Sequence, residues 1–458
     1  MTINYDVAIV GGGPAGLSAA SHLGRIGARV VLIEEQSELG GQFFKQRRGS
    51  VLAQYGHFRP DGARLISSVR ESGVNCLTSH LVWGFQNGDL WLSRLDDGKV
   101  DRIHAKSTLV ATGAYEKTIP FPGWTLPGVC TPGCALHFAT VDKVNVGQKV
   151  LVAGSGPFLL SVACALLEAG VFVIAVLEAA RPYRISSTAL EASSYLTRTV
   201  EVAKYLFALG RHRVPLKQGW RVLEATGDRR VNRVKVASES AIREFDVDAL
   251  CVGYGFSPSS ELARIMEVEC SRDPLSGDLF PITDDYGRTS QPHVYAAGEV
   301  AGIGGIHAAL NLGRLAALTI AADLGIGRRP SASEVKRLTN RRRRLRRFAQ
   351  ITASLYQLNH PYSWIEGRTL ICRCECVAAD AIRQVASRGV TDLQAVKGLT
   401  RAGMGPCQGR ECVGPVAGIL AEMCGSAVDR FPARMPIKPI RITGEMETSP
   451  IAAQSGSH

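Results

Sequence analysis

YDVAIVGGGPAGLSAASHLGRIGARVVLIE, residues 5–34, is the stretch that decides the fold. Its apolar start, residues 6–10, predicts a buried parallel strand, and residues 29–33 predict a second strand after an intervening helix. The glycines between the first strand and the helix follow the pattern G-x-G-x-x-G. Gly11 permits the tight turn, Gly13 lets a pyrophosphate approach the backbone, and Gly16 lets the helix pack closely on the strand. The stretch therefore predicts a dinucleotide-binding fold near the start of the chain.

The ligand of this fold is expected at the turn and at the end of the second strand. Pro14 and Ala15 begin the helix, whose free N–H groups and positive dipole end suit phosphates. Glu34 ends the second strand, where a carboxylate can accept both hydroxyls of an adenosine ribose. The residues that follow this strand and complete the expected nucleotide-binding set are Glu35, Gly41 and Gln42.

Two later segments return to the same fold. Residues 108–113 predict a buried strand that closes on a Thr-Gly turn, and residues 289–299 predict a strand with an acid at its carboxyl end. The glycine-rich segment 302–305 then opens a helix that runs to about residue 322. A carboxylate at this place suits a ribityl hydroxyl of FAD, whereas the alternative is a glutamate that caps the helix without a ligand. This late return favours FAD over NAD. The residues expected near the flavin end are Thr112, Gly113, Gly298, Glu299 and Gly305.

The opening pattern occurs a second time in residues 149–178, as strand, Gly154-Ser-Gly156 turn, helix and strand. This repeat predicts two doubly wound domains. Leu159 replaces the third glycine, so the second helix cannot pack as closely on its strand. The acid Glu178 comes one place later than Glu34 does in the first copy. The ligand of the second fold is left open between NAD, ATP and no nucleotide.

Length and composition describe an ordinary globular protein. The chain has 458 residues, 45% of them hydrophobic and 21% charged, which suits two to four domains with cores of their own. No run is as long and apolar as a membrane span, and the chain enters a strand at once, so the sequence predicts a cytoplasmic protein without a membrane span. The net charge is +12, and much of the positive surplus lies in residues 336–347. This basic run predicts a solvated helix face. An acidic partner surface is favoured over a nucleic-acid site as its binding partner.

Five of the twelve cysteines crowd into residues 372–412, which in a reducing compartment points to a metal or cluster site before disulfides. The spacing is C-x-C-x32-C-x4-C, so two pairs of thiolates could each hold one iron of a 2Fe-2S cluster. Zinc is the rival metal, because four thiolates also suit a tetrahedral site. Cys376 is a fifth thiol that leaves the choice of ligands open. The favoured metal ligands are Cys372, Cys374, Cys407 and Cys412.

A separate pair, Cys130 and Cys134, lies just before the second nucleotide fold, where thioredoxin-reductase-like enzymes keep a redox C-x-x-C. Here three residues intervene between the cysteines, and neither an acid nor a histidine flanks them in the sequence. Cysteines without a redox function are therefore favoured over a disulfide centre.

These motifs together resemble a known family. The order of residues 11–16, 108–113, 154–157 and 298–299 is similar to that of glutathione-reductase-like flavoproteins with two dinucleotide-binding domains, over residues 1 to about 325. Residues 111–128 and 255–263 resemble the larger subunit of heteromeric amino- and imino-acid dehydrogenases. That group includes opine oxidases, hydrogen cyanide synthase and proline or hydroxyproline dehydrogenases. The family usually has aspartate where Glu299 stands, which weakens the expected flavin contact. Residues 370–424, with Arg401-Ala-Gly-Met-Gly405 before the third cysteine, resemble the helical 2Fe-2S domain of bacterioferritin-associated ferredoxin.

The resemblance implies an α/β fold with two doubly wound domains and a small helical 2Fe-2S domain. The expected boundaries are residues 1–118 with 270–328 for the FAD domain, 119–269 for the second dinucleotide-binding-like domain, 329–368 for a basic linker, 369–426 for the cluster domain and 427–458 for a tail.

The resemblance also implies an electron-handling component that contains FAD and a 2Fe-2S cluster. Its partner would be a D-amino-acid-oxidase-like flavoprotein that oxidises an opine or another secondary amine to a keto acid and an amine. The resemblance further implies an FMN at a subunit interface and a small ferredoxin-like subunit. No catalytic residue is identified, because the substrate site is expected on the partner. The alternatives are an NAD(P)H-dependent disulfide or ferredoxin-type reductase that acts alone, and a non-catalytic carrier.

Overall fold

The computed structural model describes residues 4–45, 60–181, 196–273, 277–425, 428 and 432–441. The chain folds as two compact units: unit 1 is Met1–Tyr115, Ser257–Ala349 and Pro432–His458, and unit 2 is Glu116–Phe256 and Gln350–Phe431. The chain passes from one unit to the other within β7 (Ala114–Glu116), β16 (Phe256–Pro258) and α9 (Ala332–Leu355). The return to unit 1 therefore begins at residue 257, earlier than the boundary of 270 that the sequence suggested.

Unit 1 is built on a parallel sheet. Its strands in spatial order are β3 (Asn75–Leu77), β2 (Val30–Ile33), β1 (Asn4–Val10), β6 (Val100–Val110) and β19 (Val294–Ala296). β4 (His80–Gln86) and β5 (Asp89–Arg94) add an antiparallel extension to the other half of β6. Segments 186 residues apart in the chain are thus neighbours, because β19 pairs with β6 and places Val294 opposite Thr108.

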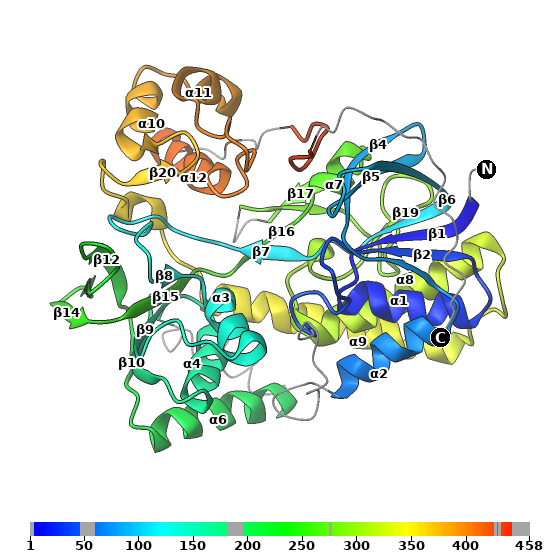
Figure 1. Ribbon diagram of the computed structural model, residues 1–458, viewed down its shortest axis with the longest axis horizontal. Coiled ribbons are helices and arrows are strands. Elements are labelled where there is room, and N and C mark those ends of the chain that lie inside the picture. Colours follow the sequence, from blue (N-terminus) through cyan, green and yellow to red (C-terminus); the bar gives the residue numbers. More distant parts are fainter. Residues whose placement is uncertain are drawn as a thin grey trace. The chain divides into compact units, whose positions relative to one another are not determined.

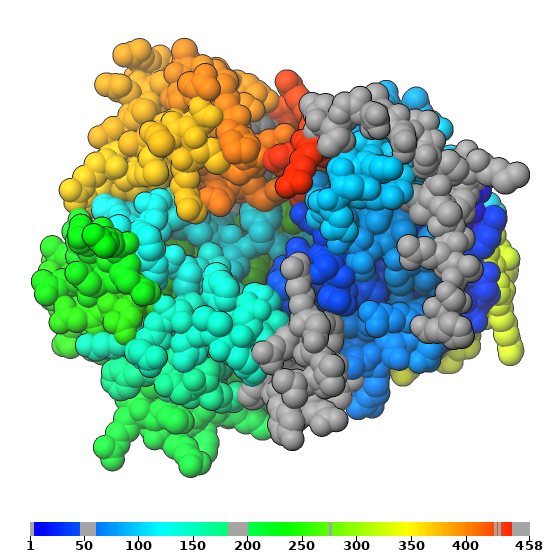
Figure 2. Space-filling view, in the orientation of Figure 1, coloured from blue at the N-terminus to red at the C-terminus, as the bar shows by residue number. Residues whose placement is uncertain are grey.

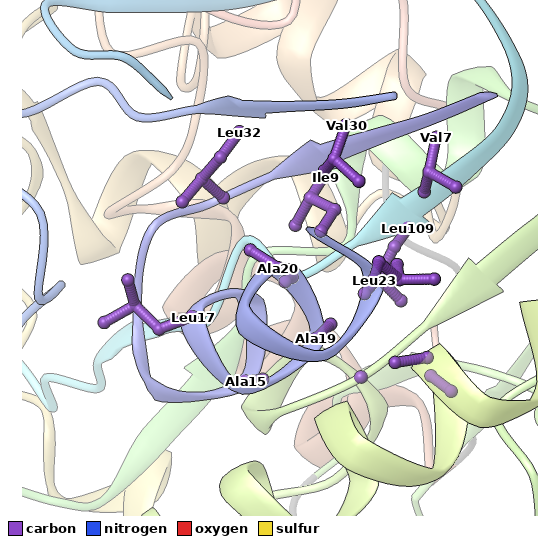
Figure 3. Packing of buried hydrophobic residues seen from close by; sticks show 14 of the residues in the cluster. Val7, Ile9, Ala15, Leu17, Ala19, Ala20, Leu23, Val30, Leu32 and Leu109 are labelled. Atoms are coloured by element: carbon purple, nitrogen blue, oxygen red, sulfur yellow. The ribbon is translucent and has the colours of Figure 1, made fainter. Parts of the chain in front are cut away.

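Helices α1 (Pro14–Arg25), α2 (Pro60–Glu71) and α8 (Gly305–Leu324) pack with this sheet (Figure 1). The core between sheet and helices contains aliphatic side chains of β1, β2, β6 and α1, such as Ile9, Leu17, Leu32 and Leu109 (Figure 3). Among the described residues, α8 alone is long and apolar enough to cross a membrane. Most of α8 is buried in this core, which accounts for its apolar composition.

Shorter elements of unit 1 include α7 (Glu261–Ile265), β17 (Cys270–Arg272), β18 (Leu279–Pro281) and the 3-10 turn η3 (Glu299–Ala301). Residues 432–441 of the expected tail also belong here. Ile437 is buried with the side chains of β4 and β5, and its N–H donates to the Trp83 carbonyl at 2.9 Å. This part of the tail is therefore packed within unit 1, and residues 427, 429–431 and 442–458 of the expected tail lie outside the described residues.

Unit 2 contains a second parallel sheet. Its strands in spatial order are β11 (Leu216–Gln218), β10 (Phe172–Glu178), β9 (Lys149–Gly154), β15 (Ala249–Gly253) and β8 (Val129–Cys130). A bulge between Val173 and Ala175 absorbs one extra residue of β10. Glu178 consequently lies opposite Gly154, although in the sequence it comes one place later than Glu34 does after its own turn. The acid at the end of the second strand therefore lies beside the glycine turn in both folds, although its later position in the second sequence copy did not predict this.

The other elements of the second fold are α3 (Pro132–His137), the π-helical turn η1 (Phe138–Asp142), α4 (Phe158–Glu168) and α6 (Leu196–Arg211). An antiparallel sheet of β12 (Arg221–Thr226), β13 (Arg233–Ala237) and β14 (Ile242–Asp246) follows them. Leu159, at the position of the missing third glycine, is buried between α4 and the sheet. The larger side chain thus fills the space that a glycine would leave for a closer helix.

The last part of unit 2 is a small domain, here called the cluster domain, which contains all five crowded cysteines. Its elements are the 3-10 turn η4 (Pro361–Trp364), β20 (Leu370–Cys372), β21 (Val377–Ala378), α10 (Ala379–Ala386), α11 (Leu393–Thr400) and α12 (Val413–Cys424). These elements enclose an apolar core that includes the buried cysteines Cys372 and Cys412. Asp392 caps α11 by accepting the Ala395 N–H at 2.8 Å.

The expected basic linker is mostly the 24-residue helix α9. Its basic run is only partly a solvated face. Arg342 is buried and donates to the Asp284 carbonyl at 2.6 Å and to Thr283 at 3.1 Å, and Arg343 pairs with Asp285 at 2.6 Å. Two of the arginines thus anchor α9 within unit 1, whereas Arg337 and Arg341 are exposed.

Candidate functional site

The first glycine turn has no room for side chains at two of its positions. A Cβ on Gly16 would lie 1.9 Å from the Gly11 carbonyl oxygen, and a Cβ on Gly11 would lie 2.3 Å from the Ala111 carbonyl oxygen. Gly11 also has a φ of 110°, which side chains disfavour. The turn therefore packs backbone against backbone, which leaves N–H groups at the start of α1 available to a phosphate.

Glu34 lies at the end of β2 beside this turn. Its two carboxylate oxygens accept the Gly12 N–H at 2.7 Å and the Gln36 N–H at 2.8 Å. Burial raises the pKa of Glu34 above its ordinary value, while these N–H groups favour the charged form. Each oxygen keeps a second lone pair, so the carboxylate can still accept the hydroxyls of a ribose.

The structure brings distant members of the expected FAD set to the same turn. A Cβ on Gly41 would lie 2.8 Å from the Gly13 Cα, and a Cβ on Gly298 would lie 2.9 Å from the Ala15 Cβ. Gly41, with a φ of 58°, and Gly298, with a φ of 85°, both use backbone conformations that favour glycine. Gly313 of α8 was missed from the sequence, yet a Cβ there would lie 2.2 Å from the Ala15 carbonyl oxygen.

Glu299 follows β19 and caps α8. Its carboxylate accepts the Gly305 N–H, and burial raises its pKa. This capping contact is the alternative to a flavin contact, and one carboxylate can serve both because it has several lone pairs. Thr112 donates its hydroxyl to the Ser259 carbonyl at 2.7 Å. The flavin contacts of both residues stay predictions.

The remaining members of the expected FAD set lie around the same turn. Pro14 is the first residue of α1, and Gly113 has a φ of 72° after the strand β6. Glu35 forms an ion pair with Lys438, so its carboxylate is already engaged by the tail. Gln42 is exposed.

The second glycine turn surrounds Glu178 with more donors than the first turn offers Glu34. Glu178 accepts the Ser155 hydroxyl at 2.7 Å, the Gly156 N–H at 2.9 Å and the Ala180 N–H at 2.8 Å. Burial raises the pKa of Glu178 to about 7 in spite of these bonds. The second acid therefore has less capacity left for a ribose than Glu34 has.

The four expected metal ligands form two thiol pairs in the cluster domain. The Cys412 thiol is hydrogen-bonded with Cys372, and the Cys407 thiol is hydrogen-bonded with Cys374. Cys407 also acts electrostatically on Cys412, so the two pairs are close to each other. The sequence suggested pairs of near neighbours, Cys372 with Cys374 and Cys407 with Cys412, whereas the contacts in the structure join the two ends of the motif.

The surroundings of the four thiols fit a binuclear cluster. Within the described ranges, no group of three or more cysteine, histidine or acidic side chains converges as a site for a single metal ion. Two neighbouring pairs suit two irons, each of which takes two thiolates. The backbone N–H groups of Gly409 and Glu411 point at the Cys407 sulfur, where they stabilise a thiolate. The residues present therefore fit a 2Fe-2S cluster.

Cys376 differs from the four paired cysteines. It is exposed, its backbone has a φ of 54°, and its thiol is 3.9 Å from the Arg373 carbonyl oxygen. Among the described residues, Cys376 makes no contact with another thiol. Two arginines of the cluster domain pair with acids, Arg401 with Glu375 at 2.8 Å and Arg373 with Glu411 at 3.6 Å. Acidic partners therefore offset the positive charge of these two arginines.

Gly405, the last residue of the Arg401–Gly405 segment named in the sequence analysis, makes a testable contribution to this site through its contact with Cys374. A Cβ on Gly405 would lie 2.1 Å from the Cys374 Cβ, so Gly405→Ala must displace a ligand. We expect the variant, purified anaerobically, to lose most of its iron and most of its visible absorbance above about 400 nm. Gly414→Ala in α12 is the matched control, because nothing lies within 4 Å of its Cβ. Equal iron in both variants would contradict the assignment of Cys374.

Cys130 belongs to a group of three thiols in unit 2. Its sulfur is 3.7 Å from that of Cys251, because Cys130 in β8 lies opposite Cys251 in β15. No acid flanks it in the sequence, but Glu116 lies close by in the fold and accepts the Gly133 N–H at 2.8 Å. A hydrogen bond with Cys134 lowers the pKa of the Cys130 thiol, yet Cys251 and burial raise it well above its ordinary value. A thiol of this kind is a poor nucleophile, which agrees with cysteines that have no redox function.

Comparison with known proteins matches two parts of the chain. Residues 5–321 match the family described as pyridine nucleotide-disulphide oxidoreductase, and residues 370–422 match the BFD-like [2Fe-2S] binding domain. Hydrogen cyanide synthase subunit HcnB of Pseudomonas aeruginosa is 34% identical over 464 residues, which cover 96% of this chain and 97% of that protein. An opine oxidase subunit of Agrobacterium tumefaciens is 30% identical over 459 residues, which cover 96% of this chain and 90% of that protein.

Solved structures with the same fold include L-proline dehydrogenase from P. horikoshii, with a TM-score of 0.71 and 25% identity over 96% of this chain and 79% of that chain. Thioredoxin reductase from T. acidophilum has a TM-score of 0.52 and 21% identity over 70% of this chain and 98% of that chain, and it shows the fold alone. The glutathione-reductase-like α/β fold and the 2Fe-2S domain predicted from the sequence are thereby confirmed. The matched families account for FAD and a cluster, and they do not support the FMN expected at a subunit interface.

Proposed function

Because the chain belongs to the pyridine nucleotide-disulphide oxidoreductase family and contains a BFD-like 2Fe-2S domain, we propose that it is the electron-transfer subunit of a heteromeric dehydrogenase or oxidase. The observation that carries this proposal is one polypeptide with both a glycine cradle for FAD and four paired thiols. Relatives that are similar over nearly the whole chain are named as subunits, of hydrogen cyanide synthase and of opine oxidase. The family resemblance and this combination of sites together support a subunit rather than an enzyme that acts alone.

The residues of this chain would hold and tune the cofactors. The turn at residues 11–16 and Glu34 would bind the pyrophosphate and the adenosine ribose of FAD. Cys372, Cys374, Cys407 and Cys412 would hold the 2Fe-2S cluster, and the N–H groups around Cys407 would stabilise its thiolate. When bound, FAD supplies two-electron chemistry and the cluster supplies one-electron transfer. The protein contributes binding and electrostatics.

The substrate site would lie on a partner of the D-amino-acid-oxidase type. That partner would remove a hydride from the carbon next to the nitrogen of an opine or another secondary amine. Water would then split the resulting imine into a keto acid and an amine. Opine oxidation is the finer proposal here, and it is supported by the similarity to the opine oxidase subunit of A. tumefaciens over 96% of this chain.

Reconstitution with the partner tests this function. The isolated chain, purified anaerobically, should contain FAD and iron but oxidise neither octopine, nopaline nor proline with a dye as electron acceptor. Addition of the D-amino-acid-oxidase-like flavoprotein from the neighbouring genes should raise the rate on its substrate by about 100-fold or more, because only the complex then joins the substrate site to the electron carriers.

The competing enzyme, an NAD(P)H-dependent disulfide reductase, makes opposite predictions. NADH or NADPH would bleach the flavin of the isolated chain, and Cys134→Ser would stop turnover. Substrate oxidation by the single chain, or such bleaching, would count against the subunit proposal.

A further inference from the structure

The carboxyl edge of the parallel sheet in unit 2 is the place where the fold family binds its pyridine nucleotide. In doubly wound folds, ligands lie outside the carboxyl ends of the strands, at the turn that joins strand and helix. β9 ends at Gly154, β10 ends at Glu178 and β15 ends at Gly253, so these three residues mark that edge. Whether a nucleotide fits can be judged from the side chains and backbone groups that lie there.

The glycine turn at this edge is engaged by a segment from the far end of α9. The Ser155 oxygen lies 2.7 Å from a Glu178 oxygen and 3.0 Å from the Tyr356 carbonyl oxygen, so its single proton is shared between these two acceptors. Ser155 occupies the middle position of the turn, between Gly154 and Gly156, and Gly156 is the counterpart of Gly13, where a pyrophosphate would approach the backbone. The chain itself thus engages the hydroxyl of this turn, and the acid that would hold the ribose already accepts three donors.

Two tyrosines close the same edge. Tyr254 directly follows β15, and it packs against both the core of the second fold and the core of the cluster domain. Tyr356 directly follows α9, and both tyrosine hydroxyls lie within electrostatic range of Glu178. Burial raises the pKa of Tyr356 to about 12. Both tyrosines are therefore partly buried side chains close to the acid that would hold a ribose.

The cluster domain is fastened to the second fold around this edge by polar and stacking contacts. The Trp124 indole donates to the Leu370 carbonyl at 2.7 Å, and the Arg373 guanidinium lies 5.4 Å from the centre of the Trp124 ring. Arg368 pairs with Glu224 at 2.9 Å. In Figure 2, yellow and orange atoms of residues beyond 350 meet the cyan surface of residues near 120.

A further stacking contact lies just beyond β11, at the same edge. The Arg221 guanidinium lies 4.9 Å from the centre of the Trp364 ring. Arg221 begins β12, which follows β11 after a short turn, and Trp364 ends η4 in the segment that leads into the cluster domain. A basic side chain at the nucleotide edge is thus occupied by an aromatic ring of this chain.

The start of α4 adds a steric obstacle. Phe158 is its first residue, where the first fold has Ala15 after Pro14, and the Phe158 ring packs on Phe256 with a centroid separation of 5.4 Å. The second helix N-terminus thus presents an aromatic ring where the first presents a methyl group. The residues at this edge do not fit a dinucleotide.

We propose that residues 356–364 occupy the nucleotide site of the second fold and lock the cluster domain onto it, so that unit 2 binds its own chain in place of NAD, NADP or ATP. Ser155 links the two segments, because its hydroxyl connects the glycine turn to the Tyr356 carbonyl. The inference rests on the geometry of unit 2 and does not depend on the proposed function.

Hydrogen exchange on the whole FAD-loaded chain tests the proposal. NADH, NADPH or ATP at about 1 mM should leave exchange of residues 153–160 and 178–180 unchanged, since a ligand with even a weak Kd would be bound at that concentration. Ser155→Ala should speed exchange of residues 356–364 by about fivefold or more, because the Tyr356 carbonyl loses its partner. Ser18→Ala is the matched control: the Ser18 hydroxyl makes the same kind of bond, to the Leu310 carbonyl at 2.9 Å, in unit 1. It should leave residues 356–364 unchanged.

Two results would overturn the proposal. Protection of residues 153–160 or 178–180 by any of the three nucleotides would show that the site is open. Exchange of residues 356–364 at the wild-type rate in Ser155→Ala would show that the Ser155 hydroxyl does not hold this segment in place. The nucleotide measurements use the wild-type chain, so they decide the matter even where the variant fails to fold.

Discussion

Cys412→Ser is expected to reduce the iron content from about two atoms per chain to a small fraction of one. Cys412 is buried and shares a hydrogen bond with Cys372, so its loss leaves one iron with a single thiolate. Electron transfer from the partner to an external acceptor should fall by about 100-fold or more, because even outer-shell changes at metal sites cost up to that factor. Iron analysis, the visible spectrum and turnover of the reconstituted complex measure these effects.

Cys376→Ser is the matched control for the cluster ligands. It removes a thiol from the same motif, but this thiol is exposed and faces the Arg373 carbonyl. We expect it to retain its iron and FAD. Loss of iron from Cys376→Ser together with retention in Cys412→Ser would assign the cluster to a different set of cysteines. Zinc in place of iron in the wild-type chain would remove the redox role of the domain.

Gly16→Ala is expected to abolish FAD binding and to lower the free energy of unfolding of unit 1 by about 3 kcal/mol or more. The added Cβ would lie 1.9 Å from the Gly11 carbonyl oxygen and 3.3 Å from the Ile9 side chain. Because the nearest atom is backbone, no rotamer change can relieve the overlap, and the helix must move away from the strand. The turn would then no longer hold its N–H groups at the phosphate position.

Gly210→Ala provides the comparison for this variant. Gly210 lies in α6, and nothing lies within 4 Å of its Cβ. Alanine is favoured over glycine in a helix by about 1 kcal/mol, so this variant should be at least as stable as the wild type and retain its FAD. Flavin fluorescence after gel filtration and thermal unfolding report both quantities. A Gly16→Ala chain that holds FAD as the wild type does would refute the role given to this turn.

Local patterns explain what could be predicted of the candidate sites. The G-x-G-x-x-G turn, Glu34 and the C-x-C and C-x4-C pairs are encoded within a few residues, because turn geometry and ligand spacing act over short distances. The contacts that complete each site are not local. Gly298 reaches Ala15, Gly405 reaches Cys374 and Cys251 reaches Cys130 across long stretches of chain. No spacing rule could have found these neighbours.

The sequence by itself determined the two nucleotide folds, the 2Fe-2S domain and the candidate ligands, because strand–turn–helix patterns and thiol spacing are properties of short segments. Only the tertiary structure decided which thiols pair, that a bulge in β10 returns Glu178 to its turn, and that Tyr356 lies on the second glycine turn. The physical reason is that these outcomes depend on how segments far apart in the chain compete for the same space. The polar groups at the carboxyl edge of a parallel sheet can bind either a nucleotide or another segment of the same chain. Which of the two they bind depends on the tertiary packing.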